Sequence, residues 1–172
     1  MTTTVIFFSR AGENYINGRK QSISVGNTEI LAEKISNELG VETYRLSPMI
    51  PYSENYDEAV QKAEKEKQDS TQVAYEELSI DFEQVDTVFL GYPNWWGTYP
   101  QVVATFLANH DWKNKVIYPF CTHEGSAFGS SIQDLQRACS EAEIKTGLAV
   151  RGSKADRADT AVKNWLLAYS KQ

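Results

Sequence analysis

Short runs of consecutive apolar residues alternate with segments of helical periodicity along this chain, and the alternation limits the folds open to it. Residues 4–8 read TVIFF, a run without polar alternation, as burial of both faces in a parallel sheet requires. Residues 27–39 then carry apolar side chains at the spacing of one helix face and end before Gly40. Further strands are predicted over 41–46, 87–90, 115–120 and 144–150, and further helices over 54–78, over 99–109, around 132–138 and around 161–166.

Five strands separated by helical segments predict one α/β domain over residues 1–172, with a parallel sheet that is covered by helices on both faces. In an open sheet of this kind, the ligand binds beyond the carboxyl ends of the strands, where the winding direction reverses. Three unusual loops leave these ends, after Phe8, after Gly91 and after Phe120. The functional site is therefore expected in these loops.

Charge and cysteine content exclude several classes of function. The formal net charge is −6 and the pI is near 5.0, which argues against nucleic acid or an anionic membrane as the main partner and suits either a basic protein partner or plain solubility. Cys121 and Cys139 are too few for a disulfide framework, and with only two histidines no metal site is predicted. The amino-terminal apolar run is too short for a signal peptide or a membrane span, so a cytoplasmic location is expected.

The first loop has the features of an anion site. It leads from a strand to the amino terminus of a helix, where free backbone N–H groups and the helix dipole favour a negative charge. Ser9, Asn27 and Thr28 add side-chain donors, while Gly12 and Gly26 allow close approach of the backbone. A phosphate is the expected ligand. The loop is neither a nucleotide triphosphate loop nor a dinucleotide-binding loop, because the patterns GxxxxGK[ST] and GxGxxG are both absent. Helix capping by Asn27 or Thr28 explains the Gly-Asn-Thr sequence about as well.

The middle of this loop predicts a small β-hairpin that projects over the site. Asn17-Gly18 is a favoured hairpin turn, and apolar residues flank it at 15, 16, 23 and 25. The basic residues nearby, Arg10, Arg19 and Lys20, either screen a phosphate or are simply solvated.

The second loop, GYPNWWGTYP at residues 91–100, is rich in aromatic side chains. If a phosphate lies on the first helix, an attached planar ring extends toward this loop, where Trp95, Trp96 or Tyr99 is placed to stack on it. Adjacent residues of an extended loop point to opposite sides, so that one tryptophan faces the ring while the other packs beneath. The alternative is that both tryptophans cap the core. The third loop, Thr122 to Ser126, is polar or small and suits hydrogen bonding to the edge of a heterocycle.

Together the three loops resemble those of the flavodoxin family. The motifs are FSRAGEN followed by VGNT, then GYPNWWGTYP, then PFCTHEGSAFGSS, and they span nearly the whole chain in the family's order. The segment from Tyr15 to Val25 indicates the subgroup in which an insert interrupts the phosphate loop. The resemblance implies a doubly wound five-stranded parallel sheet of order 2-1-3-4-5, with helices on both faces and FMN as the cofactor.

The cofactor-binding residues that the resemblance implies fall into three groups. At the phosphate they are Ser9, Ala11, Asn14, Gly26, Asn27 and Thr28. Along the flavin ring they are Pro93, Asn94, Trp95, Trp96, Gly97 and Tyr99. On the other side of the ring they are Cys121, Thr122, His123, Glu124, Gly125 and Ser126.

Three functions are open on this resemblance. The leading one is an FMN-binding flavodoxin that carries electrons at low potential between redox proteins, with basic partners and as a monomer. An NAD(P)H-dependent FMN or quinone reductase on the same fold is the alternative, and a non-catalytic FMN-binding module is the third, so whether the protein is an enzyme stays open. No catalytic residue is predicted. His123 either stabilises charge on the reduced flavin or is an ordinary loop histidine, and Cys121 is expected to be a buried strand-end residue rather than a reactive thiol.

Overall fold

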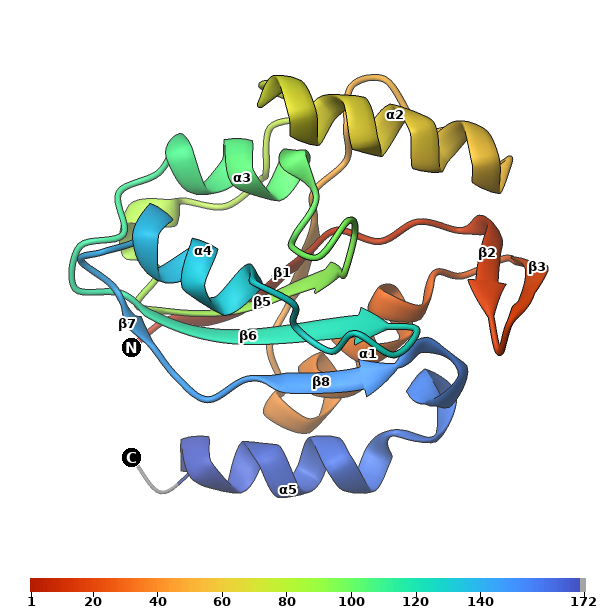
Figure 1. Cartoon of the computed structure of the whole chain (residues 1–172). Coiled ribbons are helices and arrows are strands. Elements are labelled where there is room, and N and C mark those ends of the chain that lie inside the picture. Colours follow the sequence, from red (N-terminus) through yellow and green to blue (C-terminus); the bar gives the residue numbers. More distant parts are fainter. Residues whose placement is uncertain (171–172) are drawn as a thin grey trace.

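The computed structural model describes residues 1–170, and a parallel six-stranded sheet runs through its centre (Figure 1). The strands lie in the order β4-β1-β5-β6, and β7 and β8 both pair with the outer edge of β6. Their bounds are Thr3–Phe7 (β1), Thr43–Arg45 (β4), Thr87–Pro93 (β5), Val116–His123 (β6), Glu143–Ile144 (β7) and Leu148–Arg151 (β8). With β7 and β8 taken together as the fifth strand, the predicted order 2-1-3-4-5 is confirmed. The last two residues of the predicted domain 1–172 lie outside the described residues.

Helices cover both faces of the sheet, as predicted. Figure 1 shows α1 and α5 on one face and α3 and α4 on the other, with α2 packed beside α3. Their bounds are Asn27–Leu39 (α1), Tyr56–Asp69 (α2), Gln101–Ala108 (α3), Ser131–Ala138 (α4) and Asp159–Ser170 (α5). In the described residues, no helix is both long and apolar enough to cross a membrane.

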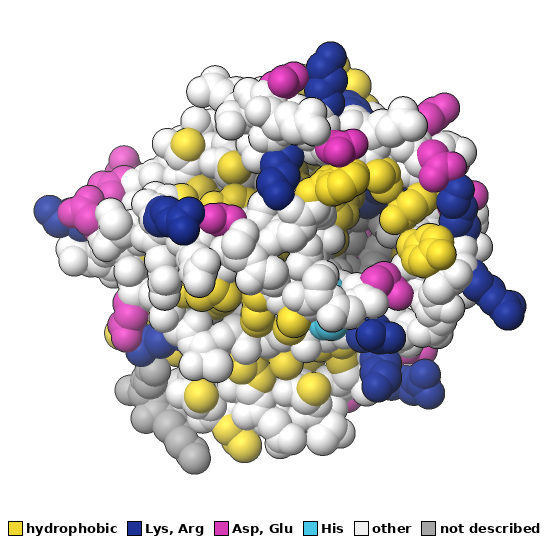
Figure 2. All heavy atoms as spheres, viewed as in Figure 1, with side chains coloured by type: hydrophobic (Ala, Val, Ile, Leu, Met, Phe, Trp, Pro, Cys, Tyr) yellow, Lys and Arg dark blue, Asp and Glu magenta, His cyan; other side chains and the backbone are white. Residues whose placement is uncertain are grey.

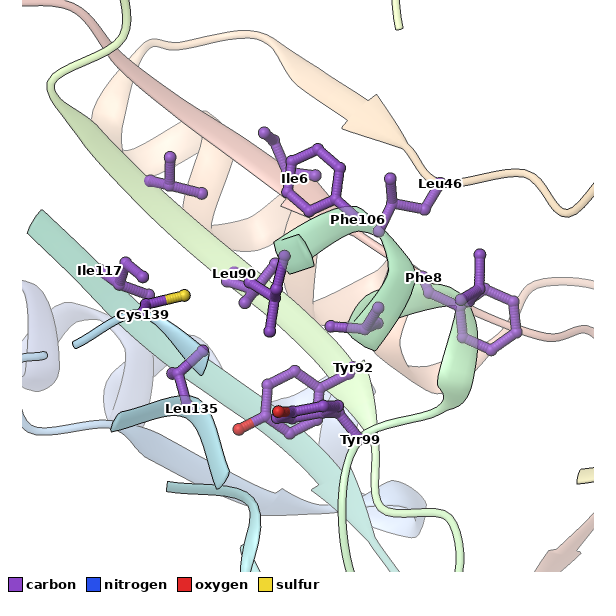
Figure 3. Packing of buried hydrophobic residues seen from close by; sticks show 14 of the residues in the cluster. Ile6, Phe8, Leu46, Leu90, Tyr92, Tyr99, Phe106, Ile117, Leu135 and Cys139 are labelled. Atoms are coloured by element: carbon purple, nitrogen blue, oxygen red, sulfur yellow. The ribbon is translucent and has the colours of Figure 1, made fainter. Parts of the chain in front are cut away.

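The apolar runs that predicted the strands supply both cores. Val5 and Phe7 pack against α1 and α5, whereas Ile6 and Phe8 belong to the core on the side of α3 and α4. Figure 3 shows Ile6 and Phe8 in this second core. Successive side chains of a strand point to opposite faces, so a continuous apolar run is what a sheet covered on both faces needs. Each such side chain contributes roughly 1.5–3 kcal/mol when fully buried.

The fifth strand differs from the prediction of one strand over 144–150. It consists of β7 and β8, which pair with β6 at Ile117–Ile144 and at Phe120–Leu148. The intervening segment is one residue longer on the outer strand than on β6, so the ladder is interrupted. Gly147 lies in this interruption, where a Cβ atom would approach the carbonyl oxygen of Pro119 to 2.7 Å.

The helix predicted over 54–78 is also shorter in the structure. It ends at Asp69, because Ser70 adopts a left-handed conformation with φ of 47°. The chain then runs extended, and Val73 N–H donates to Thr105 Oγ1 at 2.9 Å. The short 3₁₀ helix η1 (Phe82–Gln84) precedes β5. A second 3₁₀ helix, η2 (Gly152–Arg157), precedes α5.

The predicted hairpin is confirmed. Strands β2 (Gly12–Ile16) and β3 (Arg19–Ile23) pair antiparallel, with Asn17 and Gly18 at positive φ in the turn. Figure 1 shows the hairpin standing apart from the central sheet, beyond the carboxyl ends of β6 and β8. It therefore stands at the edge of the sheet where the site is expected.

Candidate functional site

A cavity of about 370 Å³ lies beside the three loops that follow β1, β5 and β6. The hairpin and one face of α2 complete its walls, and Figure 2 shows a hollow on this side of the molecule with hydrophobic side chains along its rim. The predicted cofactor-binding residues that line it are Asn14, Asn27, Pro93, Asn94, Trp95, Trp96, Thr122, His123, Glu124 and Ser126. Those that lie off its walls are Ser9, Ala11, Gly26, Thr28, Gly97, Tyr99, Cys121 and Gly125.

The amino terminus of α1 faces this cavity through Asn27. The N–H groups of Asn27 and Thr28 belong to the first turn and have no acceptor within the helix. Ser9 Oγ accepts the next N–H, that of Glu29, at 3.1 Å. Gly26 makes this approach of the two segments feasible, because a Cβ atom there would lie 2.1 Å from Ser9 Oγ. The helix end thus offers two free N–H groups and its positive dipole to an anion.

Side chains next to this helix end join it to the sheet and to η2. The buried hydroxyls of Thr28 and Thr122 are 2.7 Å apart and hydrogen-bond across α1 and β6. Gly152 packs against the amide of Asn27, since a Cβ atom on Gly152 would lie 2.5 Å from Asn27 Nδ2. The first turn of α1 is therefore held in place before any ligand binds.

The loop between Ser9 and the hairpin is organised by its own polar side chains. Asn14 Nδ2 donates to the carbonyl oxygens of Arg10 at 3.2 Å and Gly12 at 3.3 Å, while Ala11 is exposed. The guanidinium of Arg10 donates to the carbonyl oxygens of Glu13, Ser53 and Glu54 at 2.6–3.1 Å. Burial lowers the pKa of Arg10. Arg10 therefore lines the cavity, but its guanidinium N–H groups bond to the backbone of neighbouring segments.

The two tryptophans take different positions. Trp95 is partly buried, and its ring packs edge-on against Phe8 and Tyr52 at centroid distances of 5.1 and 4.9 Å. Trp96 is 45% exposed, and its indole N–H donates to the carbonyl oxygen of Val60 in α2 at 3.2 Å. Because both rings line the cavity, Trp95 forms its inner aromatic wall and Trp96 spans from the loop to α2 at its rim.

Trp96 also carries backbone strain. Trp96 and Gly97 have φ of 55° and 84° at the centre of a tight turn that Trp95 and Thr98 close. Positive φ is an outlier for a bulky residue such as tryptophan. Two neighbouring contacts fix the turn: Asn94 Oδ1 accepts the N–H of Gly97 at 3.0 Å, and the carbonyl oxygen of Gly97 accepts the N–H of Ser130 at 2.8 Å.

The loop after β6 presents His123, Glu124 and Ser126 to the cavity. His123 Nδ1 accepts the N–H of Gly125 at 2.9 Å, so Nε2 carries the proton of the neutral ring. Burial and the positive charge of Arg151 lower the pKa of His123, which favours this neutral form. The imidazole is thus a hydrogen-bond donor through Nε2.

Cys121 and Tyr99 belong to the core instead. Cys121 is fully buried, and burial raises the pKa of its thiol to about 12, so it is a packing residue rather than a thiolate at neutral pH. Tyr99 is 7% exposed and packs edge-on against Tyr92 at 5.7 Å (Figure 3). Within residues 1–170, no group of three or more His, Cys, Asp and Glu side chains is arranged to hold a metal ion.

Comparison with known proteins agrees with this geometry. The sequence model described as flavodoxin matches residues 21–168, which is most of the chain. The chain belongs to the flavodoxin family. Among solved structures, a candidate flavoprotein from Bacteroides eggerthii is 25% identical with a TM-score of 0.75, and the alignment covers 97% of this chain and 96% of that one.

Two further solved structures share the fold of this chain. A candidate flavoprotein from Bacteroides uniformis is 21% identical with a TM-score of 0.76, and the alignment covers 96% of this chain and 97% of the other. A flavoprotein from Lactobacillus acidophilus, solved in complex with FMN, is 16% identical with a TM-score of 0.66, with 91% and 97% covered. None of the curated proteins compared matches the chain.

Several residues that line the cavity are not among the predicted cofactor-binding residues. They are Arg10, Tyr15, Tyr56, Ala59, Val60, Ala63 and Gly152. The signal for α2 was present, because positions 56, 59, 60 and 63 form one stripe of a helix, but that stripe alone does not distinguish a cavity wall from a core contact. Gly152 carried no signal, because its place depends on how η2 packs against α1.

Proposed function

We propose that this protein binds FMN in the cavity and carries electrons at low potential between redox proteins. The observation that carries the proposal is the placement of a free helix amino terminus and an aromatic wall along one cavity. The Lactobacillus acidophilus flavoprotein, which shares the fold, was solved with FMN. When bound, FMN supplies reversible transfer of one or two electrons, while the protein supplies binding and tuning.

The residues of the cavity fit the two chemically different ends of FMN. A phosphate suits the N–H groups of Asn27 and Thr28, with the Ser9 hydroxyl beside them. A planar apolar ring suits Trp95, Trp96 and the face of α2, which contributes Tyr56, Ala59, Val60 and Ala63. Donors at one end and apolar surface at the other are what an amphiphilic cofactor requires.

His123 and the 122–126 loop then act on the edge of the ring. The neutral imidazole offers an N–H at Nε2, which stabilises electron density on a ring acceptor without placing a full positive charge beside it. Glu124 of the same loop lies instead near Asn27 at the start of α1, since a Cβ atom on Gly152 would approach both side chains. The neutral donor favours the reduced ring only modestly, and without a full positive charge an anionic reduced form stays poorly compensated, in keeping with a low potential.

The size of the cavity supports a carrier over a reductase. Its volume of about 370 Å³ lies near the lower end of the roughly 300–1,000 Å³ usual for ligand sites. Trp96 also bonds from its loop to Val60 on α2, which holds its ring over the rim of the cavity. A reductase must leave one face of the flavin open to hydride transfer, and this arrangement disfavours that.

We propose a cytoplasmic protein that acts as a monomer and exchanges electrons with protein partners. The net charge of −6 favours basic partners.

Anaerobic reduction of the FMN-loaded protein tests this function. We expect stepwise dithionite addition to give two separate one-electron stages in the visible spectrum, and NADH or NADPH to reduce the flavin slowly. Fast two-electron reduction by either nucleotide would replace the carrier with an NAD(P)H-dependent reductase. Failure of the purified protein to retain FMN would refute both functions.

A further inference from the structure

The β2–β3 hairpin is fixed to α2 along one side. The N–H of Glu13 donates to the carbonyl oxygen of Glu54 at 2.8 Å, and Glu13 Oε1 accepts the N–H of Tyr56 at 3.1 Å. Lys20 forms an ion pair with Asp57 at 2.6 Å. The hairpin is thus attached to the first turn of α2 by both backbone and side-chain contacts.

The tip of the hairpin is attached to the opposite side of the cavity. The N–H of Asn17 donates to Glu124 Oε2 at 3.1 Å, which joins the hairpin turn to the loop after β6. Beneath this contact Gly152 packs against both Asn27 and Glu124, since a Cβ atom on Gly152 would lie 2.5 Å from Asn27 Nδ2 and 3.0 Å from Glu124 Oε1. The hairpin therefore bridges the cavity from α2 to the 122–126 loop.

The hairpin crosses the cavity at the end that the amino terminus of α1 faces. Asn14 and Tyr15 of the hairpin line the cavity together with Asn27 of α1. The ring of Tyr15 packs against that of Tyr56 at a centroid distance of 5.7 Å. Figure 1 shows the hairpin beyond the carboxyl end of the sheet, alongside the first turns of α2.

We propose that the hairpin restricts the cavity to a flavin monophosphate and excludes the dinucleotide FAD. The inference rests on the proposed FMN function. A terminal phosphate needs only the donors at the start of α1, whereas FAD continues beyond that phosphate into a second phosphate and an adenosine. The Asn17–Glu124 contact closes the way out for such an extension.

Charge adds to this steric barrier. The carboxylate of Glu124 lies at this end of the cavity, and a second phosphate placed against it brings two negative charges together. Exclusion of a competitor by a clash and a like charge is a usual origin of binding specificity.

The test is a comparison of FMN and FAD binding to the apoprotein. In the main variant, Asn14, Tyr15, Lys20 and Gln21 are deleted; this keeps the Glu13–Ser22 and Ile16–Arg19 pairs and the turn. Removing two residues from each strand retracts the tip by about 7 Å without exchanging the faces of the hairpin. Tyr15→Ala is a milder variant that opens the same wall, and Arg19→Ala is the control, because Arg19 is an exposed hairpin residue off the cavity wall.

We expect the unaltered protein to bind FMN at least about 100-fold more tightly than FAD, and the shortened hairpin to lower this ratio by at least about tenfold. Tyr15→Ala should lower the ratio by about threefold or more, and Arg19→Ala should leave it unchanged. Should circular dichroism show that the shortened chain does not fold, Tyr15→Ala alone decides, and an unchanged ratio then refutes the inference.

Two other outcomes separate this inference from the function on which it rests. Equal affinity of the unaltered protein for FMN and FAD, or a folded shortened variant that keeps the full preference, overturns the role of the hairpin while FMN binding stands. An unaltered protein that binds neither flavin overturns the proposed function and the inference with it.

Discussion

At the scale of single residues, adjacent side chains in one loop have opposite structural roles. Trp95 packs edge-on against Phe8 and Tyr52, so its loss leaves a gap in an aromatic cluster. Trp96 is held at the rim of the cavity by a turn with a φ of 55° that disfavours it. A strained backbone conformation of this kind is kept where the surrounding contacts hold it in place, often at a functional site. Substitutions of Trp96 can therefore distinguish an effect on folding stability from an effect on ligand binding.

Trp96→Asn and Trp96→Ala make that separation. Both variants remove the ring, but asparagine tolerates positive φ better than alanine, so we expect the asparagine variant to be about 0.5–1 kcal/mol more stable. Both should bind FMN more weakly, by about 0.5–1.5 kcal/mol, because the stacking surface is gone. Urea unfolding of the apoproteins and fluorescence titration with FMN measure the two effects. Equal stability of the two variants would show that the turn is not strained.

Gly26→Ala tests the close approach of α1 to the first loop. A methyl group at residue 26 would lie 2.1 Å from Ser9 Oγ and 2.8 Å from the carbonyl oxygen of Arg10, so both segments must move. We expect a loss of roughly 1–3 kcal/mol in stability together with weaker FMN binding. Gly40→Ala is the matched control: its φ of 66° makes alanine unfavourable, yet no atom lies within 4 Å and the residue is far from the cavity. That variant should lose roughly 1–2 kcal/mol of stability and bind FMN normally.

His123 should make the protein less stable as the pH falls. Burial and Arg151 lower its pKa in the folded state, and Glu124 opposes them more weakly. Below about pH 6.5 the unfolded chain therefore binds a proton at His123 more readily than the folded chain does. The contribution of His123 to the free energy of unfolding is thus present above that pH and is lost as the pH falls. Urea unfolding at pH values on both sides of this range should show a smaller loss for His123→Gln than for the unaltered protein. An equal loss in both would exclude His123 as the source.

At the scale of elements, the sequence predicted well where one local pattern determines the structure. The run Val5 to Phe8 predicted a doubly buried strand, and Asn17-Gly18 predicted the hairpin, because both depend on neighbouring residues only. The cofactor loops could be located because parallel strands bring their carboxyl ends to one edge.

The errors arose where tertiary contacts override the local pattern. The polar, helix-favouring composition of α2 continues past Asp69, but the chain leaves the helix at Ser70 and Val73 then bonds to Thr105. The interruption at Gly147 depends on its packing against Pro119, far away in sequence. The apolar stripe of α2 was visible, yet whether it faces a core or a cavity is decided by the distant loops opposite.

Arg10 connects several of these elements, and its removal should loosen them together. Its guanidinium donates to carbonyl oxygens of the hairpin and of the segment before α2. Arg10→Lys keeps the charge but loses the planar set of donors, so we expect a loss of about 1.5–3 kcal/mol in stability. Hydrogen exchange should show faster opening of the β2–β3 amides, whereas Arg19→Lys, on the exposed side of the same hairpin, should behave like the unaltered protein. Unchanged exchange in Arg10→Lys would mean that the other hairpin contacts suffice.

At the scale of the whole molecule, the relevant quantity is the long-range field. Figure 2 shows acidic and basic side chains on both sides of the hollow, so no single-sign patch surrounds the site on this face. A partner that approaches from a distance therefore experiences mainly the net charge of −6.

This field gives a prediction for electron transfer by the FMN-loaded, reduced protein. With a basic acceptor such as cytochrome c, attraction should make the second-order rate fall about tenfold as ionic strength rises from roughly 0.01 to 0.15 M, because the screening length shortens from about 30 to about 8 Å. With the ferricyanide anion, repulsion should make the rate rise over the same range, since screening then removes a barrier. Stopped-flow measurement with both acceptors separates the net charge from effects of salt on the flavin itself, which would shift both rates in one direction. A rate with cytochrome c that does not depend on salt would show that the partner-facing surface is locally neutral, and would remove the reason to expect a basic partner.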